Sequence, residues 1–413
     1  MFMLRLSLLL VVFVDVMGQG LIFPIINTLI IDPSSTFLPH DTPLGTREMM
    51  YGWLAGIFYI FWFFGAAYIS KLSDYIGRKN GMVICLIGAL AGYILTAIAI
   101  EISNYYLLLA GRAITGFTAG NQPIAQAAFI DISKDDKQLT SNMSKIVAAL
   151  ALGLVGGPLI AGVLSDSAII GSYATLELPF YFAACLVLIT LFSVVIFYHD
   201  ASDERRKIDF GVNEVFLNLW RLRGRSTIIK ISAVWFFFEV GLNSFYIYIN
   251  DYTIERFQFT TFQNSMLMIV IGLSMAFSSI MLTGSLTSRF RKIPIVTGSI
   301  IVMSISIAIF MLNNNSDFTY LLVIPILVAF GVGYPVMLTL FSASANKDEQ
   351  GWVMGVSIAL FTLGSGMISI LGGTLMAVNI NLTFTAGIIS FFIALILIAT
   401  FWRQSDVKAL DTQ

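Results

Sequence analysis

The chain has 413 residues and a formal net charge of −1, and its mean hydropathy is +0.86. Hydrophobic residues make up 57% of the sequence and charged residues only 11%, whereas soluble globular domains carry about 25% charged residues. This much apolar surface excludes a water-soluble fold, and the near-zero net charge gives no electrostatic basis for a nucleic-acid partner.

Long apolar runs recur along the sequence, and a helix that crosses a bilayer needs about 20 mostly apolar residues. We therefore predict an all-α membrane protein with twelve transmembrane helices in two six-helix bundles. The first run is too long for a signal peptide and lacks a small-residue cleavage site, so we expect it to remain as a span. The predicted spans are Leu4–Ile31, Met49–Ile69, Asn80–Ile100, Tyr105–Ile130, Ile146–Leu164, Leu176–Tyr198, Ile229–Ile249, Gln263–Leu286, Ile293–Leu312, Tyr320–Ala345, Trp352–Val378 and Thr383–Trp402.

A polar, strongly charged stretch between the sixth and seventh runs divides the chain near its midpoint. It predicts an N-terminal bundle over 1–198, a cytoplasmic linker over 199–228 and a C-terminal bundle over 229–413. A weak repeat supports the division, because the basic turns Ser70–Lys79 and Gly284–Lys292 each follow the second helix of a half. Such duplication is expected of transporters that move two related halves about a central site.

Lysine and arginine residues predict the orientation. Apart from Arg112, which lies inside a predicted span, nearly all of them fall on the face that the two termini share, and the opposite face holds only Arg47 and Arg256. The positive-inside rule then places both termini in the cytoplasm.

Neither histidines nor cysteines cluster in the sequence. His40 and His199 fall in polar connections, while Cys85 and Cys185 fall in apolar runs. This pattern offers no disulfide framework, zinc site or catalytic cluster, and the phosphate-binding G-x-x-x-x-G-K-[ST] loop is missing. We expect neither an enzyme nor a metal nor a cofactor, although a membrane enzyme or a structural subunit is the alternative from another class.

Two charged residues, Asp15 and Arg112, lie away from the ends of the predicted spans of the first half. Asp15 sits near the bilayer midplane in span one, where an acid suits a proton carrier; a hydrogen-bonded carboxyl that serves helix packing is the alternative. Arg112 lies in span four, and an arginine at a helix centre costs roughly 2.5 kcal/mol or more. Arg112 could take part in proton coupling, or its long side chain could simply reach the bilayer surface. The sequence leaves both alternatives open.

Span seven carries a further acid among aromatic residues. Spacings of four and seven residues put Glu239, Asn243 and Tyr246 on one helix face. A carboxylate among aromatic rings suits an amphiphilic or cationic substrate, although aromatic stripes also serve packing or lipid contact. We expect Glu239 and Asp15 to face one cavity between the two halves, because a charged group facing lipid is unfavourable.

Four motifs resemble those of the major facilitator superfamily, and within it of the twelve-span drug/proton antiporters, most closely the bacterial tetracycline-resistance exporters. The turn Ser70–Lys79 resembles the signature G-x-L-a-D-r-x-G-R-K, from which Ser70 and Tyr75 depart. Arg112–Gly116 resembles the R-x-x-x-G helix tied to proton handling, and Gly153–Gly162 resembles the antiporter signature g-x-x-x-G-P-x-x-g-G. Span one resembles the first exporter helix at Asp15, Gly18, Gly20, Leu21, Ile22 and Pro24.

The resemblance implies the major facilitator fold, with pseudo-symmetric bundles, and a monomeric transporter in the bacterial inner membrane. Its partners would be lipid, protons and a small-molecule substrate, with the proton gradient as the energy source. Proton coupling is then expected at Asp15, Arg112 and Glu239. Gating is expected at Asp74, Gly77, Arg78, Lys79, Gly157 and Pro158. Substrate binding is expected at Gln19, Gln122, Gln126, Glu239, Asn243 and Tyr246.

The function that the sequence predicts is proton-coupled efflux of a drug, siderophore or metabolite by alternating access. The alternative is an uptake symporter for a nutrient such as an amino acid; the glycine-rich signature around Pro158 favours export. The exporters carry further acids in spans three and nine, whereas this sequence has none within Asn80–Ile100 or Ile293–Leu312. The resemblance therefore implies the class of transporter but does not extend to tetracycline as the substrate.

The orientation gives a first testable prediction. A cysteine that replaces Ser35 should be labelled by a membrane-impermeant thiol reagent added to intact cells, whereas one that replaces Ser202 should be protected. The reverse labelling pattern would invert the predicted orientation.

Overall fold

The computed structural model describes residues 2–133, 136–200, 222–345, 349–402 and 407. Over these residues the regular structure is helical throughout, and eleven helices are long and apolar enough to cross a membrane. The predicted all-α membrane fold is thereby confirmed. Most of the predicted linker over 199–228 lies outside the described residues.

The helices follow one another along the chain with short connections. The first half contains α1 (Phe2–Ile30), α2 (Leu44–Ile76), α3 (Arg78–Glu101), α4 (Tyr105–Phe117), α5 (Asn121–Asp131), α6 (Asp136–Ser165), α7 (Ser167–Ile170), the 3₁₀ turn η1 (Gly171–Tyr173) and α8 (Leu178–Phe197). The second half contains α10 (Ser226–Phe257), α11 (Thr261–Phe277), the π-helical turn η2 (Ser278–Leu282), α12 (Thr283–Thr287), α13 (Lys292–Leu312), α14 (Ser316–Ala343), α15 (Gln350–Val378) and α16 (Leu382–Phe401).

Predicted span four differs from the others because it is broken into α4 and α5. The helix stops at Phe117 and resumes at Asn121. Pro123 explains the break, since proline has no N–H and its ring clashes with the carbonyl four residues earlier in a continuous helix. In the first turn of a new helix the same proline is tolerated, because the N–H groups there have no intrahelical partners.

The chain forms two compact units that exchange short segments. The first comprises Met1–Pro43, Trp53–Phe210 and Gln258–Ile269, and the second comprises Leu44–Gly52, Gly211–Phe257 and Val270–Gln413. Two helices, α2 and α11, therefore each contribute residues to both units. The predicted bundle limits, 1–198 and 229–413, stay a prediction.

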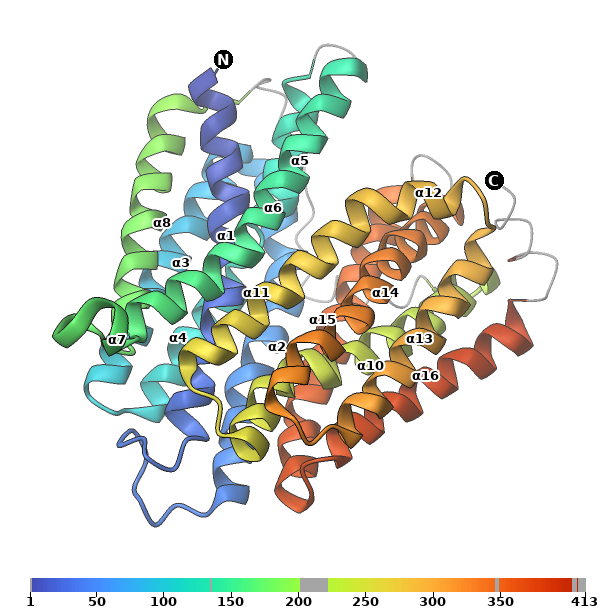
Figure 1. Cartoon of the computed structure of the whole chain (residues 1–413). Helices are drawn as coiled ribbons and strands as arrows, with labels where there is room; N and C mark the ends of the chain where they lie inside the picture. Colours follow the sequence, from blue (N-terminus) through green and yellow to red (C-terminus); the bar gives the residue numbers. More distant parts are fainter. Residues whose placement is uncertain (1, 134–135, 201–221, 346–348, 403–406, 408–413) are drawn as a thin grey trace. The chain divides into compact units, whose positions relative to one another are not determined.

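In the first unit, α1 is packed on three sides. It runs along α6 and also contacts α8 and α5, while α3 packs against α4, α8 and α5 (Figure 1). The approach of α6 to α1 depends on Gly157, where an added Cβ would lie 2.2 Å from the carbonyl oxygen of Met17. Small residues allow such close backbone contact. In lipid the hydrophobic effect does not hold helices together, so association depends on close van der Waals packing of this kind.

The second unit is built around α10, which packs against α15 and α16, while α13 packs against α14. Aromatic side chains fill one part of this packing: the Tyr252 and Phe384 ring centroids lie 4.8 Å apart, and those of Phe245 and Phe310 lie 5.2 Å apart. Offset and edge-to-face aromatic pairs of this kind add roughly 0.5–1.5 kcal/mol each beyond burial.

The contact between α1 and α6 can be tested by adding one methyl group. Gly157→Ala should lower the melting temperature of the purified protein by several degrees, because the added carbon meets backbone that cannot rotate away, and overpacking costs about 1–3 kcal/mol. Differential scanning fluorimetry measures the change.

Gly298→Ala is the matched control for this test. Gly298 lies within α13, and no atom outside its local helix lies within 4 Å of the added Cβ. Alanine is better than glycine in a helix by roughly 1 kcal/mol, so the control should keep or raise the melting temperature. Equal melting temperatures for the two variants would contradict the close contact between α1 and α6.

Candidate functional site

The break in span four leaves the start of α5 in need of hydrogen-bond acceptors. A helix begins with N–H groups that have no partner in the helix itself, and a side chain at the preceding position often accepts from them. Here that position is Gly120, which has no side chain to do so. The acceptor for the first turn of α5 must therefore come from elsewhere.

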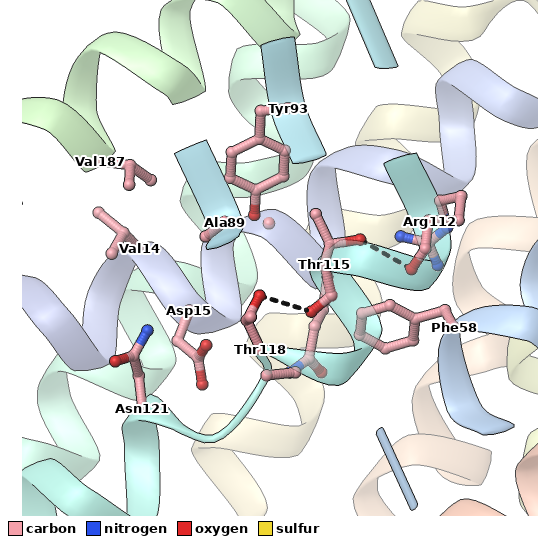
Figure 2. A pocket seen from close by; sticks show the side chains of 13 residues that line it. Val14, Asp15, Phe58, Ala89, Tyr93, Arg112, Thr115, Thr118, Asn121 and Val187 are labelled. Carbon is pink, nitrogen blue, oxygen red and sulfur yellow. Dashed lines mark hydrogen bonds between the residues drawn. The ribbon is translucent and has the colours of Figure 1, made fainter. Parts of the chain in front are cut away.

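Asp15 of α1 lies beside this first turn. Its carboxyl group interacts electrostatically with the backbone N–H of Gln122 and with the side chain of Asn121. Figure 2 shows the Asp15 carboxyl group pointing toward the connection that leads into α5, beside Asn121. A negative charge in this place also interacts favourably with the positive end of the helix dipole.

A small cavity of about 20 Å³ lies beside Asp15, which is about enough for one water molecule. All of its lining residues belong to the first unit. The polar side chains that line it are Asp15, Gln19, Tyr93, Arg112, Thr115, Thr118 and Asn121 (Figure 2).

Asn121 contributes a second polar feature to this cavity. Its side chain is 1% exposed, and among the described residues no hydrogen-bond partner reaches its Oδ1 atom. A buried acceptor without a donor costs roughly 1–3 kcal/mol. The cavity is therefore suited to receive a hydrogen-bond donor.

Arg112 closes one side of the cavity from α4. Its side chain is 4% exposed, so the guanidinium is buried and does not reach the bilayer surface. Its Nε atom lies 3.4 Å from the carbonyl oxygen of Leu54, and its Cζ atom lies 4.3 Å from the centroid of the Phe58 ring. The structure thus brings Asp15 and Arg112, two of the three predicted coupling residues, to the same cavity.

Tyr93 of α3 lies between these two charged residues and interacts electrostatically with both. Its hydroxyl rests against Gly18, where an added Cβ would lie only 1.6 Å from the phenolic oxygen. The glycine in the Asp15–Pro24 motif therefore has a direct structural reason, because a larger residue would push Tyr93 out of the cavity.

The predicted glutamine ligands of the first unit are not equivalent. Gln19 lines the cavity, whereas Gln122 is not part of the lining, although its backbone N–H interacts electrostatically with Asp15. The lining of the cavity does not include Gln126, which is half-buried on α5.

In the second unit Glu239 is fully buried on α10. Asn243 donates from Nδ2 to the Glu239 carboxyl at 3.3 Å and to its carbonyl oxygen at 2.9 Å, so these two predicted neighbours do share a helix face. Among the described residues no hydrogen-bond partner reaches Glu239 Oε1. Tyr246, the third member of the predicted face, is half-buried.

Aromatic rings surround the helix turn that carries Glu239. Tyr334 of α14 interacts electrostatically with Glu239, and its ring centroid lies 5.2 Å from those of Trp235 and Phe330. Phe238 stacks on Phe330 with their centroids 5.7 Å apart. An acid within such a layer is chemically suited to an organic cation, because ring faces and carboxylate both attract positive charge.

The basic turn between α2 and α3 is bonded inside the first unit. Gly77 has φ +98°, a conformation that favours glycine. Arg78 pairs with Asp131 at the end of α5 over 3.6 Å. Lys79 donates from Nζ to the Val195 carbonyl oxygen at 2.7 Å. The Asp74 side chain, which we expected to act in gating, lies outside the described residues.

Tyr198 lies beside this turn, immediately after α8. Burial raises the pKa of the Tyr198 phenol well above its usual range, and the carboxylates of Asp200 and Asp131 raise it further, while Arg78 opposes them. The phenol therefore stays neutral at physiological pH and adds no charge to the turn.

Sequence reasoning missed a group of three carboxyl residues in the second unit. Glu48 and Asp251 are buried to within 2% exposure, and Glu255 interacts electrostatically with both. All three residues lie just beyond the predicted apolar runs, and this position at the span ends was the available signal.

These carboxyl groups do not make a metal site. Among the described residues, no three His, Cys, Asp or Glu side chains are arranged to hold a metal ion.

Long apolar helices in two units, with charged side chains buried inside the spans, define a polytopic membrane transporter. The family model of the Major Facilitator Superfamily matches residues 8–334. The chain belongs to this superfamily, as its motifs predicted, and it is therefore a transporter and not an enzyme.

Several characterised relatives are similar over most of their length. The class C tetracycline resistance protein of Escherichia coli is 25% identical over 354 residues, which cover 85% of this chain and 84% of the relative. The class B protein of Escherichia coli is 24% identical, with 90% and 87% covered. Multidrug resistance protein 2 of Bacillus subtilis (strain 168) is 23% identical, with 90% and 88% covered.

Solved structures support the fold. The human organic anion transporter MFSD10 (TETRAN) aligns with a TM-score of 0.70 at 19% identity, covering 96% of this chain and 99% of that one. A D-xylose–proton symporter aligns with a TM-score of 0.74 at 14% identity, covering 97% of both chains.

Proposed function

We propose that the protein is a proton-coupled antiporter that exports a small amphiphilic compound from the bacterial cytoplasm by alternating access. The observation that carries this proposal is that Asp15 and Arg112 line the same cavity within the membrane-spanning part of the first unit. Charged residues at such depth are expensive and are commonly retained for ion or substrate pathways.

Asp15 has the features that a proton site needs. Its carboxyl group lies beside a cavity that has room for about one water molecule, through which a proton could reach it. Arg112 lines the same cavity and contributes a fixed positive charge.

Glu239 is the proposed contact for the substrate. Its Oε1 atom is an acceptor without a partner among the described residues, and the aromatic rings around it suit an apolar, positively charged molecule. The expectation that Asp15 and Glu239 face one cavity concerns both units and stays a prediction, as do the substrate roles of Gln19, Gln122, Gln126, Asn243 and Tyr246.

The relatives support export in preference to uptake, because those matched over most of their length are named as resistance proteins. We also propose that the chain works as a monomer in the bacterial inner membrane and uses the proton gradient as its energy source. The distribution of lysine and arginine residues supports cytoplasmic termini. The basic turn with Asp74, Gly77, Arg78 and Lys79, and the contact made by Gly157 and Pro158, would gate access.

Exchange of one proton for one monovalent cation moves no net charge. Such exchange responds to the pH gradient alone, and each pH unit sustains a tenfold accumulation, or about 1.4 kcal/mol. Exchange of a proton for a neutral compound would also draw on the membrane potential, at about 2.3 kcal/mol per 100 mV.

The direction of coupling can be measured in proteoliposomes that contain the purified full-length protein. The probe is the compound that most raises the melting temperature in a panel of dyes, antibiotics, iron chelators and amino acids. An antiporter should accumulate it in vesicles that are acidic inside, with the membrane potential clamped. Asp15→Asn should abolish this accumulation while it still permits downhill exchange, because the amide keeps the shape and cannot release a proton.

Asp317→Asn serves as the matched control, since Asp317 is exposed at the start of α14. It should accumulate the probe as the wild type does. Accumulation in vesicles that are acidic outside would instead indicate a symporter, and wild-type accumulation by Asp15→Asn would exclude Asp15 as the coupling acid.

The role of Glu239 can be tested by binding. Glu239→Gln should weaken binding of tetraphenylphosphonium at least tenfold, while binding of neutral triphenylphosphine oxide changes little, because only the cation gains from the carboxylate. It should also remove the pH dependence of cation binding. Isothermal titration calorimetry on the purified protein measures both affinities.

Glu101→Gln is the matched control, because it makes the same substitution at an exposed glutamate. It should leave both affinities unchanged. An equal loss of affinity for the cation and the neutral compound would show that Glu239 supports the fold of the site without recognising charge.

A further inference from the structure

Helix α14 carries a proline within its length. Pro335 has no N–H, so the carbonyl group of Gly331, four residues earlier, loses the donor that a continuous helix would supply. A backbone carbonyl without a donor is unfavourable at membrane depth, because no water is available to take the place of the missing group. The Gly331 carbonyl therefore needs a donor from outside α14.

That donor comes from the neighbouring helical segment of the second unit. The Ser279 hydroxyl donates to the Gly331 carbonyl oxygen at 2.7 Å, and the Thr283 hydroxyl lies 3.4 Å from the same oxygen. The two hydroxyl residues are four positions apart, which puts them on one helix face. Gly331 permits the approach, because an added Cβ at this position would collide with the Ser278 side chain.

The serine that supplies this donor lies in the π-helical turn η2. In this turn the Thr283 N–H donates to the Ser278 carbonyl oxygen, five residues earlier, whereas an α-helix joins residues four apart. Turns of this kind are rare and frequently mark functional positions in helices. Two irregular turns, η2 and the proline interruption of α14, are therefore joined by one side-chain hydrogen bond.

The interrupted turn of α14 also carries two of the aromatic rings around Glu239. Phe330 and Tyr334 lie on either side of the freed carbonyl group, and their ring centroids are 5.2 Å apart. Phe330 stacks on Phe238, and Tyr334 contacts Trp235, both on the part of α10 that carries the acid. A change of backbone angle at the interruption therefore moves these rings relative to Glu239.

We propose that Ser279 is a positioning residue for the substrate site: its hydroxyl holds the proline interruption of α14 and thereby fixes the Phe330 and Tyr334 rings around Glu239. Ser279 acts through the backbone of α14, so it contributes to the shape of the aromatic layer and not to its charge. This inference rests on the proposed function only in taking the layer around Glu239 as the substrate contact.

A double-mutant cycle with Ser279→Ala and Pro335→Ala tests the hydrogen bond without any ligand. Hydrogen exchange is followed by mass spectrometry on the full-length protein in lipid nanodiscs. Ser279→Ala alone should lower the protection of residues 330–339 about fivefold, the size expected for one lost hydrogen bond. In the Pro335→Ala background the same change should have little effect, because the alanine restores an N–H that bonds Gly331 within α14.

Three further variants complete the cycle. It is repeated in a Thr283→Val background, so that the second hydroxyl cannot replace the first. Ser279→Thr keeps a hydroxyl at this position and should retain the wild-type protection. Ser304→Ala is the matched control, because Ser304 on α13 donates to the Ile300 carbonyl oxygen of its own helix, and it should leave the protection of α14 unchanged.

Calorimetry then tests whether the bond positions the rings. Ser279→Ala should weaken binding of tetraphenylphosphonium and of neutral triphenylphosphine oxide alike, each about fivefold, because both ligands use the aromatic layer. This pattern differs from the loss expected for Glu239→Gln, which concerns the cation alone. In the Pro335→Ala background Ser279→Ala should cause no further loss, whereas a general destabilisation by the serine change would persist there.

The proposal is overturned if Ser279→Ala lowers the protection of α14 equally in both backgrounds, or in neither. It is also overturned if protection falls while both affinities keep their wild-type values, because the bond would then hold the helix without placing the rings; this result leaves the proposed function intact. A wild-type protein that binds neither probe would instead reject the proposed contact at Glu239, and the positioning role with it.

Discussion

The first unit depends on one constraint: backbone N–H and C=O groups at membrane depth must find partners inside the protein. Continuous helices meet this requirement within each span, but span four does not, because Pro123 interrupts it. The break exposes the N–H groups of the first turn of α5, and the Asp15 carboxyl group lies beside that turn and interacts electrostatically with Gln122 N–H. Gly18 has a separate, steric role, because it leaves room for the Tyr93 hydroxyl in the same cavity.

The spans could be predicted from the sequence because membrane helices carry long apolar runs that need no knowledge of their neighbours. The ends of the helices could not be predicted in this way, because each apolar run stops at the first charged residue whereas the helix continues past it. Glu48 and Asp251 belong to α2 and α10 and are buried by packing within the second unit. The break in span four was also missed, because the apolar run continues through Thr118–Gly120; the spacing of Gly120 and Pro123 was the local signal that marked it.

The individual site residues were accessible to sequence reasoning, whereas their partners were not. Asp15, Arg112 and Glu239 stand out because charges are rare within spans. Asn121 and Tyr93 look ordinary in the sequence, and they matter because α1 packs against α5 and α3 places a phenol against Gly18. Such contacts depend on tertiary packing between helices, which the residue pattern along a single helix does not reveal. The i, i+4 pair of Glu239 and Asn243 could be predicted because both residues lie on one helix.

Asp15 and Glu239 occupy chemically different surroundings, and this difference supports their separate roles in the proposed function. Asp15 lies beside a cavity of about 20 Å³, which has room for a proton or a water molecule but not for a drug-sized ligand. Glu239 lies in a layer of aromatic rings, with a single side-chain donor from Asn243 on its carboxyl group. In the proposed function, the small cavity therefore fits Asp15 to the proton, and the apolar surroundings fit Glu239 to an organic cation. Because the acids lie on α1 and α10, this proposal assigns one site to each unit.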